Sequence, residues 1–123
     1  MIIVTLLLKV ASAKRADVIT LFESFIGPVS VQPGCLSVNL YSNTSNADLL
    51  LIEEWDSHMN LERHIRSDNF RKILAVIDMA DEKPEITFRA VSSTKGLELV
   101  EKLRKPETEF HEPAQREARD GEN

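Results

Sequence analysis

DLLLIEEWDSHMNLERHIRSDNFRKILAVI, residues 48–77, is the stretch that decides the fold of this chain. It begins as a strand, because residues 49–52 form an uninterrupted apolar run that Trp55 closes after two glutamates. Helical spacing follows at once, and His64 lies in its first turns. A strand that ends in Trp therefore leads directly into a helix that carries a His. We expect the aromatic wall and the titratable group of any pocket to come from here.

The helical half of this stretch divides into two segments. Asp56 or Ser57 offers an N-cap oxygen for the first segment, and Ser67 is positioned to cap the second. In the second segment the apolar residues follow the i, i+3, i+4, i+7 spacing of one helical face. These residues are Phe70, Ile73, Leu74 and Ile77.

Upstream of this stretch the pattern predicts a strand over 2–10, a helix over 13–26 and a strand over 35–41. Gly27-Pro28 is expected to end the helix, and the polar residues 42–47 form a hairpin loop between strands. The expected inner stripe of the helix is Val18, Phe22, Phe25 and Ile26. The expected inner residues of the strand are Leu36, Val38 and Leu40.

Downstream, residues 85–92 alternate as a fourth strand and residues 95–104 form a short third helix. The order of elements is βαββαβ plus a C-terminal helix, which is the ferredoxin-like α+β arrangement with one antiparallel sheet. The sequence therefore predicts one domain over residues 1–104. Residues 105–123 form a charged tail with Phe110 as its single large apolar residue, and it is expected to be disordered or to pack on a partner subunit.

Composition narrows the class of protein. The 123 residues carry a net charge of −5 and no basic face, which argues against nucleic acid as a partner. The apolar start of the chain lacks a preceding positive charge and is interrupted by Lys9, so we interpret it as a strand rather than a signal peptide. No stretch is long enough to span a bilayer. The single cysteine, Cys35, fits a reducing compartment, and we expect a cytoplasmic protein.

The free face of the predicted sheet is expected to be covered. A solvated face reads polar at every second residue, yet IIVTLLL in strand one and LLLI in strand three are apolar on both sides. The chain has no spare element large enough to cover that face. We therefore expect a homodimer in which the open faces of two sheets meet, forming a dimeric α+β barrel.

Four short motifs resemble those of the antibiotic biosynthesis monooxygenase family. They are PGCL at 33–36, LIEEW at 51–55, ERHI at 62–65 and SDNF at 67–70. The resemblance covers about residues 1–92 and implies the same dimeric α+β barrel. Some members of that family oxygenate phenols or hydroquinones without metal or flavin, and others degrade haem. Still others are isomerases or have no known activity, so the family is a weaker guide to reaction than to fold.

An oxygenase of this kind needs a water-poor pocket, a group that handles a proton and donors for a developing oxyanion. His64 is the candidate proton-handling residue, because imidazole titrates near neutrality. Trp55 is the second candidate catalytic residue, since it would wall the pocket and offer its indole N–H. The alternative is structural: His64 beside Leu61 and Ile65 would be a hydrogen-bonded residue at the edge of the core, and Trp55 a packing residue.

Four further residues are candidates for substrate binding. Phe22 and Phe70 would line the pocket, while Asn39 or Arg89 would donate to an oxygen. Alternation along a strand does not settle which sheet face carries the last two. They would face the dimer interior in the alternative, where Arg89 would pair with Glu53.

Other chemistries fit less well. The haem-degrading members combine an Asn in strand one, a Trp on the second helix and a ligand His ten residues later; here strand one has no Asn, His64 holds the Trp position and Leu74 the His position. His58 and His64 do not share a helical face, so neither a metal nor any other cofactor is expected. Adjacent strand residues point to opposite faces, so Glu53 and Glu54 cannot act as a carboxylate pair.

Two classes of function follow from the sequence. The first is a cofactor-independent monooxygenase that acts on a small phenolic or quinol compound. The second is a non-catalytic barrel that binds a small ligand or another protein, with isomerase or hydrolytic chemistry as a further alternative. Whether Trp55 and His64 border a pocket discriminates between the first two.

Overall fold

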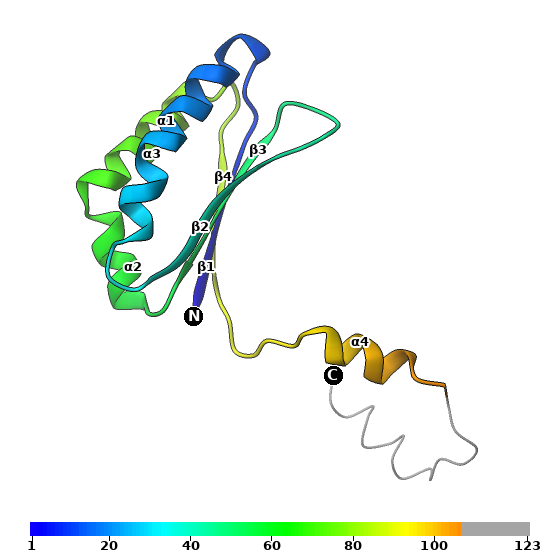
Figure 1. Cartoon of the computed structure of the whole chain (residues 1–123). Helices are drawn as coiled ribbons and strands as arrows, with labels where there is room; N and C mark the ends of the chain where they lie inside the picture. Colours follow the sequence, from blue (N-terminus) through cyan, green and yellow to red (C-terminus); the bar gives the residue numbers. More distant parts are fainter. Residues whose placement is uncertain (107–123) are drawn as a thin grey trace. The chain divides into compact units, whose positions relative to one another are not determined.

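The computed structural model describes residues 1–106 and contains one four-stranded antiparallel sheet in the order β2-β3-β1-β4 (Figure 1). The elements in chain order are β1 (Ile2–Leu8), α1 (Ser12–Ser30), β2 (Cys35–Ser42), β3 (Leu49–Trp55), α2 (His58–Ile65), α3 (Asp68–Met79), β4 (Glu85–Ala90) and α4 (Leu97–Arg104). The predicted ferredoxin-like α+β fold with an extra C-terminal helix is confirmed. Within one chain the sheet is open and does not close into a barrel.

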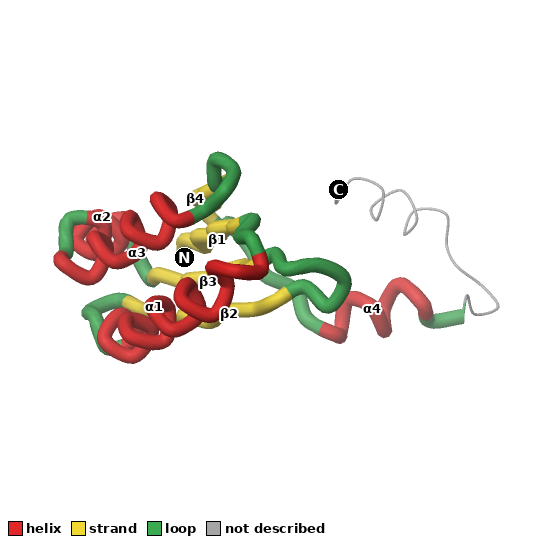
Figure 2. Tube along the Cα trace, turned by 90° about the horizontal axis from the view of Figure 1, so that it is seen from above, coloured by secondary structure: helices red, strands yellow, loops and turns green. Residues whose placement is uncertain are grey.

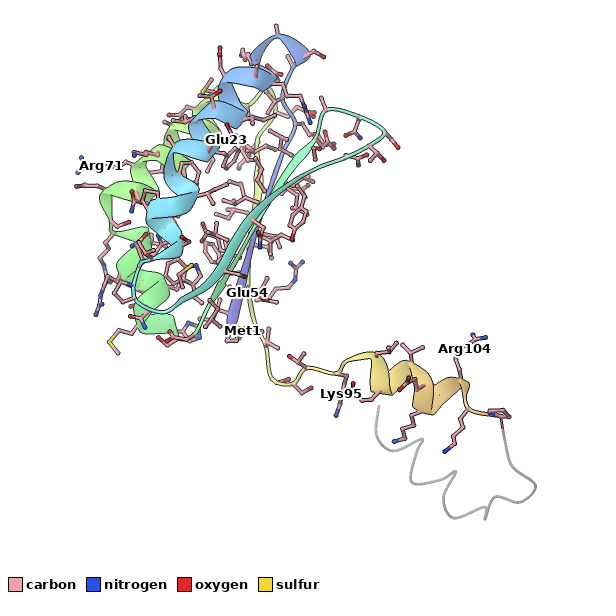
Figure 3. The ribbon with its side chains drawn as sticks, in the orientation of Figure 1. Met1, Glu23, Glu54, Arg71, Lys95 and Arg104 are labelled. Carbon is pink, nitrogen blue, oxygen red and sulfur yellow. The ribbon has the colours of Figure 1, made fainter. Side chains whose placement is uncertain are left out.

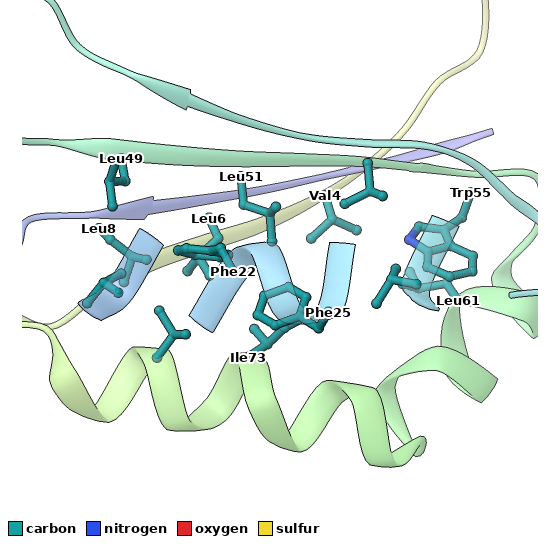
Figure 4. Packing of buried hydrophobic residues seen from close by; sticks show 14 of the residues in the cluster. Val4, Leu6, Leu8, Phe22, Phe25, Leu49, Leu51, Trp55, Leu61 and Ile73 are labelled. Atoms are coloured by element: carbon teal, nitrogen blue, oxygen red, sulfur yellow. The ribbon is translucent and has the colours of Figure 1, made fainter. Parts of the chain in front are cut away.

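The helices α1, α2 and α3 all lie on the same side of the sheet (Figures 1 and 2). Every second residue of β1 and β3 is buried against them, and the residues between are half-buried on the other face. This alternation is what a sheet with one covered face produces. Figure 4 shows the resulting core between the sheet and the helices. Its labelled members include Val4, Leu6, Leu8, Phe22, Phe25, Leu49, Leu51, Leu61 and Ile73.

Helix α1 continues beyond the point where the sequence predicts its end. It contains Gly27 and Pro28 and ends at Ser30. Pro28 has no N–H for the helical ladder and its ring crowds the preceding turn, which normally ends a helix. Val29 is completely buried, so its packing in the core holds the last turn in place and offsets the lost hydrogen bond. The predicted end at residue 26 is therefore wrong.

Serine caps separate α2 from α3 as expected. The Ser57 side chain accepts from the backbone N–H of Asn60, and the Ser67 side chain accepts from that of Phe70. One predicted core residue of α3 is misplaced, because Leu74 is 49% exposed and Val76 is buried in its stead.

A β-bulge distorts the start of β2. The pairing with β3 shifts register between Cys35 and Ser37, so the residue between them leaves the regular alternation. As a result Leu36, predicted to face the core, is 56% exposed, while Val38 and Leu40 keep their predicted side.

The described chain divides into two compact units, residues 1–92 and the segment from residue 93 onward. The first unit holds the sheet with α1, α2 and α3, and side chains such as Arg71 on α3 point away from the sheet into solvent (Figure 3). The second unit holds α4. The domain boundary predicted after residue 104 stays a prediction, and the expectations for the tail, including Phe110, fall outside the described residues. Among residues 1–106 no helix is long and apolar enough to cross a membrane.

Candidate functional site

The last residues of β3 direct a carboxylate, Glu53, and an indole, Trp55, toward the helices. Leu49, Leu51, Glu53 and Trp55 alternate on the helix-covered side of the strand, and all four are buried. Helix α2 places His64 above them, also buried. The strand that ends in Trp and the helix that carries a His therefore meet, as their order in the sequence predicts.

Three rings pack together at this point. The imidazole of His64 stacks on the indole of Trp55, with ring centroids 4.5 Å apart and an interplanar angle of 23°. The ring of Phe70 meets the same imidazole edge-on, at 5.4 Å and 86°. His64 thus lies between an aromatic face and an aromatic edge, which fixes the orientation of its ring.

Polar contacts complete what we name the inner cluster: Gln32, Glu53, Trp55, His64 and Phe70. Trp55 Nε1 donates to Glu53 Oε1 at 2.9 Å, and His64 Nδ1 lies 2.9 Å from Gln32 Oε1. His64 Nε2 lies 3.3 Å from Glu53 Oε1, which is an ion-pair distance without the alignment of a hydrogen bond. Within residues 1–106, Glu53 Oε2 has no hydrogen-bond partner although it is buried.

The inner cluster is shielded from solvent on the side that faces the core. Trp55 and His64 have no exposed surface and Glu53 is 2% exposed. Gln32 and Phe70 are half-buried and form its outer side. In chemical terms the cluster offers a carboxylate and an imidazole, which can hold or move a proton among apolar rings.

The thiol of Cys35 is the titratable group of β2 nearest to Glu53. Burial raises the pKa of Cys35, and the negative charge of Glu53 raises it further, while hydrogen bonding with the backbone of Ser37 lowers it. The net effect keeps this residue a neutral thiol at physiological pH. It is therefore a poor nucleophile and a poor metal ligand.

A glycine turn joins the segment of Gln32 to helix α2. Gly34 has φ +84°, and a Cβ atom at this position would lie 2.4–2.6 Å from the Asn60 side chain. The same Asn60 donates to Asp56 Oδ1 at 2.9 Å, and the Asp56 N–H donates to the Gly34 carbonyl. These bonds hold the turn that follows Gln32 against the start of α2.

The remaining predicted site residues do not join the cluster. Phe22 is a buried core residue that packs on Phe25 with centroids 5.2 Å apart. Asn39 pairs with Ile52, and Arg89 pairs with Ile3, so both lie on the open face of the sheet.

The alternative ion pair between Arg89 and Glu53 does not form, because the two side chains lie on opposite faces. Arg89 instead donates weakly to Thr5 Oγ1 at 3.4 Å. The predicted separation of the two adjacent glutamates is confirmed: Glu53 contacts Trp55 on the helix side, whereas Glu54 accepts from Ser37 Oγ at 2.6 Å on the open face.

Sequence reasoning missed two members of the inner cluster. Glu53 has a signal that could have revealed it, because it shares the inward register of Leu49, Leu51 and Trp55 and is a carboxylate where an apolar residue is expected. Gln32 has no comparable signal. It comes from the turn after α1, and only the fold brings it to His64.

The open face of the sheet carries apolar side chains that no other element of residues 1–92 covers. Ile3 and Leu7 of β1 and Leu50 and Ile52 of β3 are half-buried there, next to one another across the strands. At the hairpin end a shallow groove of about 170 Å³ is lined by these strands and the hairpin, with Tyr41 at its side. In the part of the chain that the structure describes, no three or more His, Cys, Asp or Glu side chains gather to hold a metal ion.

Comparison with known proteins bears on the fold and on the family. The family model described as antibiotic biosynthesis monooxygenase matches residues 1–76. An uncharacterized protein of Synechocystis sp. is 28% identical over 92 residues, which are 73% of this chain and 63% of that protein. The chain thus spans less than two thirds of the length of this relative.

Solved structures share the fold. A candidate antibiotic biosynthesis monooxygenase from Caulobacter crescentus is 29% identical, with a TM-score of 0.65 over 74% of this chain and 90% of that one. A conserved protein from Methanosarcina mazei is also 29% identical, with a TM-score of 0.67 over 72% and 89%. A further structure, from Deinococcus radiodurans, has a TM-score of 0.71 over 78% and 97% at 16% identity, and this likeness concerns the fold alone.

Proposed function

This chain belongs to the antibiotic biosynthesis monooxygenase family, and on that premise we propose that it is a cofactor-independent monooxygenase of a small phenol or quinol. In such a reaction a phenol and one molecule of oxygen give a quinone and one molecule of water. The substrate supplies all the electrons, so no external reductant is needed. The protein has to provide a dry, aromatic site and a group that accepts the phenolic proton.

The observation that carries this proposal is the buried polar pair of the inner cluster. A carboxylate without solvent costs several kcal/mol unless its environment compensates the charge. Glu53 is compensated only in part, because its Oε2 has no hydrogen-bond partner among the described residues. Ionisable groups buried in this way, next to the rings of Trp55 and Phe70, favour a functional role over a purely structural one.

The proposed roles follow from the contacts. Trp55 and Phe70 form the walls of the substrate site, and His64 takes part in proton handling. Phe22 contributes through core packing. Asn39 and Arg89 lie on the other face of the sheet, so in this proposal they line the interface between two copies and do not touch the substrate.

We also propose the homodimer and a cytoplasmic location. The apolar strip of Ile3, Leu7, Leu50 and Ile52 supports the dimer, because a second copy would remove this surface from water. A single cysteine supports a reducing compartment.

A second candidate function is non-catalytic binding of a small ligand. The closure of the inner cluster favours it, since neither Trp55 nor His64 has exposed surface. A binding protein needs only occasional opening beside Gln32 and Phe70, whereas an oxygenase must open in every cycle.

Oxygen uptake distinguishes the two functions. A panel of hydroquinones and naphthols is added to the purified protein in an oxygen electrode, with His64→Ala and His58→Ala compared in parallel. For a monooxygenase we expect turnover that falls by about 10²-fold or more in His64→Ala and stays unchanged in His58→Ala, whose side chain is exposed. Saturable binding without oxygen uptake would instead support the second candidate.

A further inference from the structure

The protonation state of the inner cluster can be read from its geometry. Resting on the proposed function, we infer that Glu53 holds His64 as an imidazolium, and that Glu53 Oε2 rather than His64 accepts the proton of the substrate. His64 then acts as a fixed positive charge beside the substrate. This assignment reverses the role that the sequence alone suggests for His64.

The Nδ1 side of the ring requires a proton. Gln32 Oε1 lies 2.9 Å from His64 Nδ1, and a carbonyl oxygen at that distance is a hydrogen-bond acceptor. The orientation of the Gln32 amide is supported by Asn69, whose side-chain N–H donates to the same oxygen at 3.5 Å. With the amide in this orientation, Nδ1 carries a hydrogen.

The Nε2 side of the ring faces a second acceptor. His64 Nε2 lies 3.3 Å from Glu53 Oε1 without the alignment of a hydrogen bond, and at this distance the negative charge of the carboxylate favours a positive charge on the ring. Within residues 1–106 no Lys or Arg forms an ion pair with Glu53, so the positive charge that compensates it comes from this imidazole. The pair therefore contains one proton more than a neutral His and an ionised Glu.

The contacts of the Trp55 indole indicate whether that proton lies on His64 or on Glu53. Its N–H donates to Glu53 Oε1, which favours the ionised carboxylate over the carboxylic acid. Its face stacks on His64 at 4.5 Å, a distance at which an aromatic ring attracts a cation. Both contacts of Trp55 favour a carboxylate and an imidazolium. Cys35, the neighbouring titratable group on β2, stays neutral and does not change this balance.

Among the described residues, one oxygen of the carboxylate is without a hydrogen-bond partner. Oε1 receives the indole N–H and lies next to the imidazolium, whereas Oε2 is buried and has no partner within residues 1–106. In the proposed step the substrate O–H bond breaks and an Oε2–H bond forms. The negative charge moves from Glu53 to the phenolate oxygen, next to the positive charge of His64. No electron is transferred in this step, and the resulting phenolate is the species that reacts with oxygen.

Nitrogen-15 NMR of the histidine rings tests the protonation state without any substrate. We expect both ring nitrogens of His64 to be protonated in the wild type at neutral pH, and His58 to serve as an exposed reference. Glu53→Gln should convert His64 into a neutral imidazole with its proton on Nδ1, and Glu54→Gln on the open face should leave it unchanged. A neutral wild-type His64, with its single proton on either Nδ1 or Nε2, would overturn the inference.

The activity arm separates this inference from the proposed function. If the wild type consumes oxygen, Glu53→Gln should lower turnover by about 10²-fold or more while Glu54→Gln has no effect. Full activity of Glu53→Gln would overturn the inference and leave the monooxygenase proposal standing. If the wild type consumes no oxygen, the monooxygenase proposal fails, and the ring protonation measured on the wild type still supports or overturns the imidazolium. If Glu53→Gln does not fold, the nitrogen-15 spectrum of the wild type alone still tests whether His64 is an imidazolium.

Discussion

Each face of the sheet carries side chains that its surroundings disfavour. The helix-covered face is dry, yet it holds Glu53 and His64 with almost no exposed surface. The open face has no covering element within residues 1–92, yet it carries Ile3, Leu50 and Ile52. Buried charge and uncovered apolar surface both lower the stability of an isolated chain. The difference is what the two proposed binding events would produce, a small molecule on the covered face and a second copy on the open face.

Charge on the open face should give the largest effect. Leu50→Glu brings a carboxylate into the apolar strip, and in a symmetric dimer two such carboxylates lie in one interface. Like charges in an interface cost several kcal/mol, so the dissociation constant should rise by about 10³-fold or more. Sedimentation equilibrium at micromolar concentration should report the mass of two chains for the wild type and of one chain for the variant.

The matched control places the same charge on the exposed surface of α3, away from the open face. Leu74 on α3 is 49% exposed, so Leu74→Glu adds a carboxylate outside the open face. This variant should remain dimeric. A monomeric wild type, or a Leu50→Glu variant that stays dimeric, would contradict the role given to the open face.

Removal of a charge from the covered face should cost stability. His64→Ala leaves Glu53 buried without its partner and opens a cavity between two rings, so the free energy of unfolding should fall by about 3–5 kcal/mol. His58→Ala, at the exposed start of α2, should change it by less than about 0.5 kcal/mol. Urea denaturation followed by circular dichroism measures both. Equal stability of the two variants would show that the inner pair is not coupled to the fold.

The turn that supports the covered face gives an intermediate effect. Gly34→Ala forces a side chain into the left-handed region and against Asn60, so we expect a loss of about 2–5 kcal/mol. Gly27→Ala is the control, because a Cβ there meets nothing within 4 Å in a helix. It should stabilise the protein by about 0.5–1 kcal/mol. The two melting temperatures should therefore move in opposite directions, and a shared direction would refute this view of the turn.

The smallest effect concerns the thiol of Cys35. The charge of Glu53 raises the pKa of this thiol, although burial is the larger cause. Glu53→Gln removes the charge and lowers the pKa, so more thiolate is present at a given pH and alkylation by iodoacetamide should become a few-fold faster. Glu54→Gln, on the other face, should leave the rate unchanged. An unchanged rate in Glu53→Gln would mean that Glu53 is not ionised in the folded protein.

Much of the fold could be predicted because the signals were local. Strand alternation, the serine caps of α2 and α3 and the apolar runs of β1 and β3 each depend on neighbouring residues. The errors arose where tertiary packing overrode a local signal. Burial of Val29 extended α1 through Pro28, and a bulge turned Leu36 outward.

The candidate site was predictable only in part. His64 and Trp55 follow one another along the chain, so the meeting of strand and helix could be inferred. The inward register of β3 carries a signal for Glu53 that the sequence interpretation did not use. Gln32 has no such signal, because only the folded turn brings it to the imidazole. Which face carries Asn39 and Arg89 depended on strand pairing across the whole sheet.

Fluorescence of Trp55 tests the central claim, that the covered face binds the small molecule and the open face binds the second copy. Trp55 is the single tryptophan of the chain, so its emission reports on the inner cluster alone. We would titrate a redox-inert phenol into the wild type and into Leu50→Glu, and confirm the folding of the variant by circular dichroism. The account predicts a saturable change in emission with the same dissociation constant for dimer and monomer. A change that disappears in Leu50→Glu, or no saturable change in the wild type, would contradict it.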